Sequence, residues 1–405
     1  MSDKKAQIHH HFDENRLFNY VKEFSFPRLS GTEGEEKAVE LSVEKFRDIG
    51  FNDSQIIKEP FTFSDFYSTT LIKLIMSMSL IFILLVVLSV YVYAVLTIAL
   101  IGAMAVVVIL IIRGLKHPED NGFWGEYFGD THSSINVIAH IPARFLPPND
   151  AGNIVISAHL DSKSQTFKTA WRIVIYRVWL FSGIIMGGVV ISYILWDLRI
   201  VPIGRIEIEP FGIPLLLIDF VSWILAGMIM ASNILLMFLN THNKSPGSLD
   251  NASGMAIVFE LSSYFKDHPL DHFNLWFCQF SAEELGTMGS RVFTNNREHK
   301  FTKGRVFQIN SDMVSAAGLG KRNRVEYLKS YGVFPRKQIS PLLSKYLDKA
   351  AELENIKIKG FHLSTGAHLD SVAFHLRGYD ALDISTRAAA KWTHNKDDSP
   401  EKVDP

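Results

Sequence analysis

GNIVISAHLDS, residues 152–162, is an apolar run that leads directly into a histidine and, two residues later, an aspartate. The pattern recurs twice further along the chain. LWFCQF (275–280) is followed by Glu283 and Glu284, and VFQIN (306–310) is followed by Asp312. Short apolar runs that end at polar residues predict buried β-strands. Each of these three strands would therefore carry a histidine or a carboxylate just beyond its carboxyl end.

Helical periodicity separates the predicted strands. Apolar residues recur every three or four positions in five segments, residues 15–29, 33–49, 254–265, 289–296 and 339–354. Strands that alternate with helices predict an α/β domain with a mixed, mostly parallel sheet flanked by helices. In such a sheet the carboxyl ends of the parallel strands meet at one edge. We therefore expect His159, the Glu283–Glu284 pair and Asp312 to lie close together.

Composition argues against a nucleic-acid-binding protein and against an intramolecular disulfide. The chain has 405 residues, a formal net charge of −1 and one cysteine, Cys278. Nucleic-acid-binding proteins carry a basic stripe, and this sequence has none, so we expect no nucleic-acid partner. One cysteine cannot form an intramolecular disulfide. Because Cys278 lies in an apolar run, we expect it to be buried as a small hydrophobic residue.

Two long hydrophobic blocks interrupt the predicted domain. Residues 74–112 hold no charged side chain, and residues 178–196 and 213–239 are apolar stretches joined by a polar connector. A helix needs about 20 apolar residues to cross a bilayer. The first block therefore predicts two helices with a tight turn near residues 89–94, and the second block predicts another helical hairpin.

The resulting organisation is one domain in three pieces, residues 1–70, 114–170 and 242–405, with transmembrane hairpins at residues 71–113 and 171–241. Since each hairpin crosses the bilayer twice, all three pieces lie on one side of it. We thus expect an integral, multi-pass membrane protein with four spans in the lipid bilayer. A homo-oligomer is compatible with this organisation, because four helices offer faces for a partner.

Basic residues beside the spans predict the side. Cytoplasmic flanks carry an excess of lysine and arginine. The side remote from the domain has Arg199 and Arg205, whereas the domain side has Lys73, Arg113, Lys116, Lys168, Arg172, Arg177 and Lys244. We therefore expect the domain on the cytoplasmic face. Asp219 falls within the fourth span, where a carboxylate is costly unless it faces other helices or water.

The candidate site residues predict metal chemistry. Histidines and carboxylates without a thiolate suit Zn²⁺ or another first-row divalent ion. A carboxylate can bridge two such ions, and Asp250, in the turn-forming LDNASG (249–254), is placed to do so. Two ions can activate a water molecule, and of two adjacent glutamates one can coordinate while the other takes the proton. Asp161 is expected to accept a hydrogen bond from the His159 imidazole.

Five motifs in order carry a family resemblance. They are AHLDS (158–162), LDNASG (249–254), AEELGTMGS (282–290), NSDM (310–313) and WTHNKDDSPEKVD (392–404). Together they resemble the M28 family of zinc aminopeptidases over residues 14–70 and 130–405. The resemblance implies two Zn²⁺ ions, peptide substrates and hydrolysis of N-terminal peptide bonds.

The resemblance also implies a role for each site residue. His159 and Asp312 would hold one zinc, Glu284 and His394 the other, and Asp250 would bridge them. Glu283 would be the general base. Asp161, as the residue that orients His159, is our other catalytic candidate. A cis peptide bond is implied after Asp250.

Two departures from the family pattern are visible. The family's serine-aspartate-histidine stretch reads Leu369-Asp370-Ser371, so the aspartate is kept and the histidine is not. The hydrophobic hairpins are the other departure, and the second of them follows the AHLDS motif. Two alternatives remain open. One is a glutaminyl-cyclase-like acyl transferase, a group that usually works with one zinc, and the other is a catalytically silent membrane receptor or scaffold.

Overall fold

The computed structural model describes residues 12–114, 119, 122–200, 206–208, 210, 215–318, 320, 324–332, 336–363 and 369–404. Lys116 and Arg205, which entered the prediction of sidedness, lie outside these residues. The chain divides into two compact units. The sheet unit comprises Met1–Asp65, Glu119–Lys168 and Thr241–Pro405, and the helical unit comprises Phe66–Pro118 and Thr169–Asn240.

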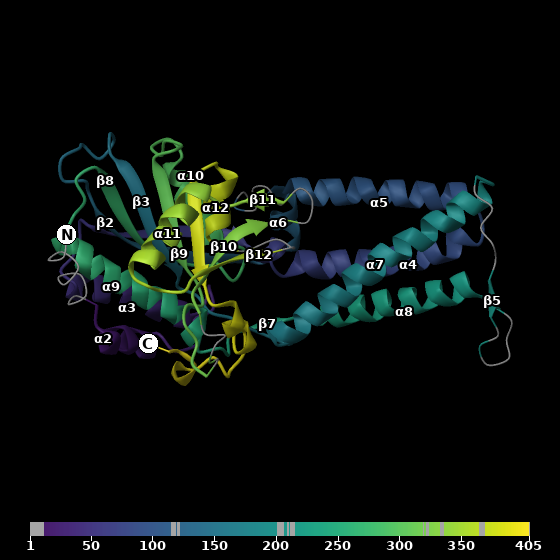
Figure 1. The fold of residues 1–405 in the computed structure, drawn as a ribbon, viewed down its shortest axis with the longest axis horizontal. Coiled ribbons are helices and arrows are strands. Elements are labelled where there is room, and N and C mark those ends of the chain that lie inside the picture. Colours follow the sequence, from purple (N-terminus) through teal and green to yellow (C-terminus); the bar gives the residue numbers. More distant parts are fainter. Residues whose placement is uncertain are drawn as a thin grey trace. The chain divides into compact units, whose positions relative to one another are not determined.

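A nine-stranded mixed sheet forms the centre of the sheet unit (Figure 1). Its order is β1-β2-β8-β3-β9-β13-β10-β11, with β12 paired to β10. The four central strands β8, β3, β9 and β13 are parallel, and antiparallel pairs occur towards both edges. The predicted fold class is confirmed. The strands are β1 (Ile56–Ser64), β2 (Thr131–Ile141), β3 (Gly152–His159), β8 (Phe273–Phe280), β9 (Val306–Ser311), β10 (Glu326–Tyr331), β11 (Lys337–Gln338), β12 (Lys359–Leu363) and β13 (Asp380–Ser385).

Helices cover both faces of this sheet (Figure 1). One face packs on α2 (Glu14–Glu23), α3 (Glu33–Asp48) and α9 (Ser253–Asp267), and the other on α10 (Met288–Arg297) and α12 (Ser371–Leu376). Side chains alternate between the two cores along β8, as the period of two in a strand requires. Phe277 joins the first core, whereas Cys278 joins the second and is fully buried, as predicted. The sheet unit also contains α6 (Gly122–Phe128) and α11 (Pro341–Leu353).

The first helix is shorter than its pattern predicted. We expected it to span residues 15–29, but α2 ends at Glu23. Pro27 accounts for the early end, because a proline disfavours the helical conformation in the residue before it and has no N–H to donate to the main-chain oxygen of Glu23, four residues earlier. The chain after α2 instead brings Arg28 into the interior of the unit, where its side chain has no exposed surface.

Arg28 joins three segments that are distant in sequence. Its guanidinium donates hydrogen bonds to the main-chain oxygens of Leu160 at 2.6 Å, Pro246 at 2.7 Å and Gly247 at 2.9 Å. It also donates to the Phe24 oxygen at 2.5 Å. Burial lowers the pKa of Arg28 to about 10, so the side chain remains charged near neutral pH. The loops that follow β3 and precede α9 are therefore held together by one cation.

Strand pairs close the sheet unit across both places where the helical unit interrupts it. Ser64 at the end of β1 pairs with Thr131 at the start of β2. Across the second interruption, β4 (Ser164–Gln165) pairs with β7 (Thr241–His242). The segment between β1 and β2, which holds the first insertion and α6, thus starts and ends at paired residues, and the β4–β7 pair lies close to both ends of the second insertion.

The helical unit consists of four long apolar helices (Figure 1). They are α4 (Thr70–Val90), α5 (Ala94–Gly114), α7 (Thr169–Asp197) and α8 (Leu217–Met237), with the short strands β5 (Glu207–Ile208) and β6 (Leu215–Leu216) between α7 and α8. All four are long and apolar enough to cross a membrane. The turn between α4 and α5 lies at residues 91–93, within the predicted range.

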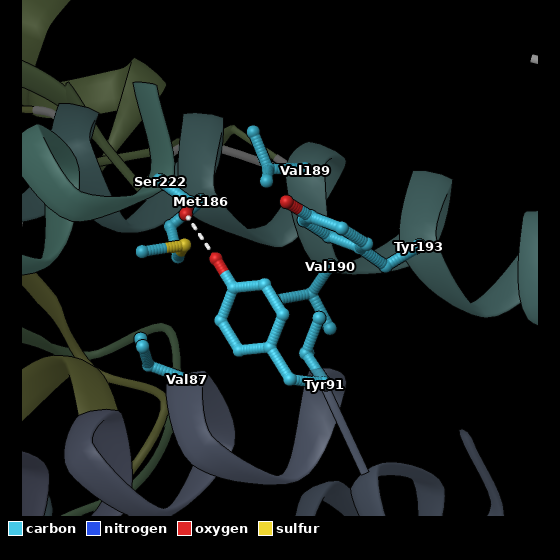
Figure 2. Close-up of a pocket in the computed structure, with 8 residues that line it drawn as sticks. Val87, Tyr91, Met186, Val189, Val190, Tyr193 and Ser222 are labelled. Carbon is cyan, nitrogen blue, oxygen red and sulfur yellow. Dashed lines mark hydrogen bonds between the residues drawn. The ribbon is translucent and has the colours of Figure 1, made fainter. Parts of the chain in front are cut away.

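Asp219 makes hydrogen bonds between helices. It accepts from the hydroxyl of Tyr193 on α7 and, at 3.3 Å, from that of Tyr91 at the end of α4. Figure 2 shows the Tyr91 hydroxyl pointing to Ser222 on α8, 3.4 Å away, with Tyr193 beside it. This carboxylate therefore faces polar groups of neighbouring helices, one of the two environments that reduce its cost in lipid.

Replacing Arg28 with methionine tests the role of the buried cation. The substitution leaves five main-chain oxygens without this donor, and we expect a loss of about 3 kcal/mol in unfolding free energy. This corresponds to a fall in melting temperature of about 10 °C for a unit of this size. Arg47→Met is the control, because Arg47 is exposed and its side chain pairs with the exposed Asp53. Equal melting temperatures of the two full-length variants in detergent would contradict this account.

Candidate metal centre

Parallel strands bring the candidate ligands together at one edge of the sheet. His159 ends β3, Glu283 and Glu284 follow β8, and Asp312 follows β9. These strands lie side by side in the order β8-β3-β9 and run in the same direction. Two further candidates come from loops, Asp250 from the segment before α9 and His394 from the segment after β13.

The first ligand group consists of His159, Asp250 and Asp312, which are all buried. The Nε2 atom of His159 lies 3.1 Å from Asp250 Oδ1 and 3.5 Å from Asp312 Oδ1. Two ligand atoms bound to one tetrahedral zinc ion lie about 3.4 Å apart, given bond lengths near 2.1 Å. The spacing of this group therefore suits such an ion.

The second group consists of Asp250, Glu284 and His394. The Nε2 atom of His394 lies 3.1 Å from Asp250 Oδ2 and 3.3 Å from Glu284 Oε1. The two oxygens of Asp250 thus face different histidines, Oδ1 towards His159 and Oδ2 towards His394. This is the arrangement expected of a carboxylate shared by two ions.

Hydrogen bonding in the centre fits a cation rather than a proton between these groups. His159 Nδ1 lies 3.0 Å from the main-chain oxygen of Asp161. An Nδ1 that donates to a carbonyl leaves the lone pair of a neutral imidazole on Nε2. Within the described part of the chain, His159 Nε2, Glu284 Oε1 and Asp312 Oδ1 are buried without a hydrogen-bond partner. Buried polar atoms are rarely left unpaired, so these residues fit a metal that would take their lone pairs.

Asp161 acts on the glutamate pair as well as on the histidine. Its carboxylate oxygen Oδ1 is 3.6 Å from His159 Nδ1, farther than the main-chain oxygen of the same residue. The two carboxylate oxygens accept from the main-chain N–H groups of Glu283 at 3.1 Å and Glu284 at 3.2 Å. Asp161 therefore fixes the backbone that carries both glutamates, a contact that the sequence did not predict.

Glu283 stands apart from the ligand groups. Its side chain is buried, and no described residue forms a hydrogen bond or ion pair with its carboxylate. Burial raises the pKa of Glu283 well above its ordinary value, and the neighbouring carboxylates of Glu284 and Asp312 act in the same direction. A free carboxylate beside two ligand groups is the position that a general base requires.

Lys163 contacts a candidate ligand directly. Its ammonium lies 2.8 Å from Glu284 Oε2 and donates to the main-chain oxygen of Glu284 at 2.9 Å. The other oxygen, Oε1, faces His394. The two oxygens of Glu284 thus have different neighbours, and one of them is already paired with a fixed positive charge.

Asp398 supports the loop that carries Asp250. It accepts from the main-chain N–H of Leu249 at 2.7 Å and from that of Asp250 at 3.2 Å. Burial and the nearby Asp250 raise the pKa of Asp398 to about 7. The peptide bond between Asp250 and Asn251 is cis, as the resemblance implied. A side chain at Gly254 would place its Cβ 2.3 Å from the Ser311 oxygen, so glycine allows this loop to approach β9.

Sequence reasoning missed Arg28, Lys163 and Asp398 as parts of the centre. Their partners lie more than 100 residues away, at Leu160, Glu284 and Leu249. A local pattern cannot show such contacts. Asp370, where the family pattern departs, is fully buried, and burial raises its pKa to about 7. The neighbouring Ser371 donates a hydrogen bond to Asp383.

Part of the chain matches known peptidase sequences. The sequence model described as "Peptidase family M28" matches residues 235–405. Aminopeptidase YwaD of Bacillus subtilis (strain 168) is 27% identical over 164 residues, which are 39% of this chain. The matched segment spans 34% of the length of that relative.

Comparison with solved structures shows the same fold. The aminopeptidase from Aneurinibacillus sp. strain AM-1 aligns with a TM-score of 0.53 at 13% identity, covering 98% of this chain and 91% of that one. The structure of BSAP, a zinc aminopeptidase from Bacillus subtilis, aligns with a TM-score of 0.51 at 13% identity, covering 97% and 91% of the two chains. Residues 235–405 therefore resemble peptidase family M28, and the chain has the fold of these two solved aminopeptidases.

Proposed function

We propose that this protein is a membrane-anchored aminopeptidase with two metal ions in its active site. The proposal rests on the position of Asp250 between two ligand groups. One of its carboxylate oxygens faces His159 and the other faces His394. One ion would be held by His159, Asp250 and Asp312, and the other by Asp250, Glu284 and His394. Zinc suits these ligands, as would another first-row divalent ion.

When bound, the two ions supply positive charge that polarises the scissile carbonyl and makes a water molecule acidic enough to attack near neutral pH. Glu283 takes a proton from the attacking water as the new C–O bond forms. The same carboxyl group then gives this proton to the departing amine nitrogen as the C–N bond breaks, and Glu283 returns to its starting state. Asp161 holds the main chain of Glu283 in place throughout.

The surface of the helical unit supports membrane anchoring. Large apolar side chains point outward from the helices, including Leu88 at 65% exposure, Val106 at 57% and Ile184 at 63%. Patches of this kind on a water-soluble protein mark a surface that another phase or partner covers. We propose that lipid covers these side chains, that α4, α5, α7 and α8 span the bilayer, and that the sheet unit lies on the cytoplasmic face.

A test on peptides separates this function from its alternatives. The purified full-length protein in detergent is incubated with zinc and a peptide that begins with glutamine, and the products are weighed by mass spectrometry. An aminopeptidase releases the first residue, a glutaminyl cyclase releases ammonia, and a silent scaffold leaves the peptide intact. The presence of both ligand groups and a free Glu283 favours release of the first residue.

Glu283→Gln tests the general base. The substitution keeps the size of the side chain but removes its ability to accept a proton, so we expect turnover to fall by about 10²- to 10⁴-fold. Metal content, measured by mass spectrometry of the purified protein, should stay near that of the unaltered chain. Glu44→Gln on the exposed surface of α3 is the control and should keep full activity. Undiminished turnover in Glu283→Gln would remove Glu283 from the mechanism.

Lys163→Met tests the effect of a fixed charge on metal binding. Because the Lys163 ammonium contacts Glu284, it opposes a cation in the second group. Without it, we expect the weaker of two zinc-binding steps in a calorimetric titration to tighten about tenfold or more. Lys168→Met removes the same charge from an exposed residue paired with Asp397 and should leave both steps unchanged. Identical titrations of the two variants would show that Lys163 does not affect the ion.

A further inference from the structure

A cavity in the sheet unit lies near the amino end of strand β3, whereas the candidate metal centre lies at its carboxyl end. Its volume is about 330 Å³, and its lining includes Trp276, His140, Asn153, Arg297 and Lys300. Asn153 is at the start of β3 and His159 is at its end. With a rise of about 3.3 Å per residue, the two sites are roughly 20 Å apart. The cavity is therefore separate from the metal centre.

Hydrogen bonds fix the base of this cavity. Asn153 Oδ1 accepts from the indole N–H of Trp276 at 2.9 Å and from the amide of Asn274 at 3.1 Å. Asn274 in turn donates to the Pro148 oxygen at 2.8 Å and accepts from the Ala143 N–H at 3.1 Å. The indole and the amide of Asn153 are thus held in one orientation before any ligand arrives.

The acidic group of the cavity is already neutralised. Glu59 accepts hydrogen bonds from Arg297 at 2.7 Å and from Asn296 at 3.1 Å, and Asn136 donates to its other oxygen at 3.0 Å. The Arg297 guanidinium also lies over the Trp276 ring, 5.1 Å from its centre. Glu59 and Arg297 therefore satisfy each other and leave no free negative charge in the lining.

Several polar groups of the lining have no partner. Among the described residues, nothing bonds to the buried Nε2 of His140, to the amide nitrogen of Asn153 or to the ammonium of Lys300. Asn153 is 6% exposed, so its unused N–H groups are in a largely desolvated place. Burial, and then the charge of Arg297, lower the pKa of His140 to about 4, so its ring is neutral near pH 7.

We propose that this cavity binds a small carboxylate the size of an amino acid or a blocked amino acid. The unpaired Lys300 supplies positive charge, and the Asn153 amide supplies N–H donors to the carboxylate. The apolar side chains of Ile57, Pro148 and Phe301 in the lining can contact the rest of the ligand. Small-molecule pockets occupy about 300 to 1,000 Å³, and this one is at the lower limit. A phosphate is less suitable, because Arg297, the side chain with the matching fork of donors, is occupied by Glu59.

Calorimetry with N-acetyl-L-leucine tests the proposal on the full-length protein in detergent. Because its α-amino group is acetylated, an aminopeptidase cannot use this compound as a substrate. N-acetyl-L-leucinamide, which has the same shape without the charge, should bind at least about tenfold more weakly, since charge-assisted hydrogen bonds are lost. Lys300→Gln should weaken binding of the acid about threefold. Lys303→Gln, a nearby change of the same charge outside the cavity, should have no effect.

Asn153→Asp gives an independent measurement. The aspartate keeps an oxygen for Trp276 and Asn274 but replaces the donating amide with a negative charge, so binding of the acid should fall at least about tenfold. If this variant does not fold, the comparison of Lys300→Gln with Lys303→Gln still tests the proposal. Equal binding of the acid and the amide overturns the proposal. Equal affinities of Lys300→Gln, Lys303→Gln and the unaltered chain also overturn it, because they place the acid elsewhere, for example at the metal centre.

Discussion

Buried negative charge at the carboxyl ends of the parallel strands must be balanced, and the rest of the centre depends on how this is done. Carboxylates from five segments are buried there, namely Asp161, Asp250, Glu283, Glu284, Asp312 and Asp398. Among the described residues the cations in contact with this region are Arg28, which binds main-chain oxygens, and Lys163, which pairs with Glu284. A buried charge without a partner is unstable. Two divalent ions shared through Asp250 would balance the charge, and the unpaired atoms of His159, Glu284 and Asp312 mark where they would bind.

The same constraint accounts for the loops around the centre. A ligand must be held in position before the ion binds if the site is to be selective. Asp161 fixes the glutamate pair, Asp398 fixes Leu249 and Asp250, and Arg28 joins the loops after β3 and before α9. These supports come from different ends of the chain. The centre is therefore a property of the folded sheet unit and cannot form from any one motif.

The helical unit can be inserted without disturbing the metal centre, because strand pairs hold the sheet unit together beside each insertion. The pair Ser64–Thr131 joins the two ends of the segment that holds the first insertion, and the pair Ser164–His242 joins the chain on either side of the second. The first pair belongs to the central sheet and the second forms a small separate sheet, and the ligand-bearing strands β3, β8 and β9 keep their order. We infer that apolar hairpins could be added at these two places without displacing the ligands, as long hairpin loops are added to other domains.

The sequence was sufficient to predict features that depend on local pattern. The parallel strands, the polar residue after each of them and the four apolar helices all follow from periodicity and from residue type. Features that depend on distant contacts were not accessible. Arg28 appears in the sequence as one basic residue after a proline, and the early end of α2 was hidden by apolar residues that continue past Glu23. The carboxylate of Asp161 was expected beside His159, but its nearer hydrogen bonds are to main-chain N–H groups that arrive from β8.

The central claim is that two ions share Asp250. X-ray diffraction from crystals of the full-length protein grown with zinc, recorded at the zinc absorption edge, tests it directly. The account predicts two anomalous peaks about 3.5 to 4 Å apart, one beside His159 and Asp312 and the other beside Glu284 and His394, with the Asp250 carboxylate between them. A single peak, or peaks away from Asp250, would contradict it.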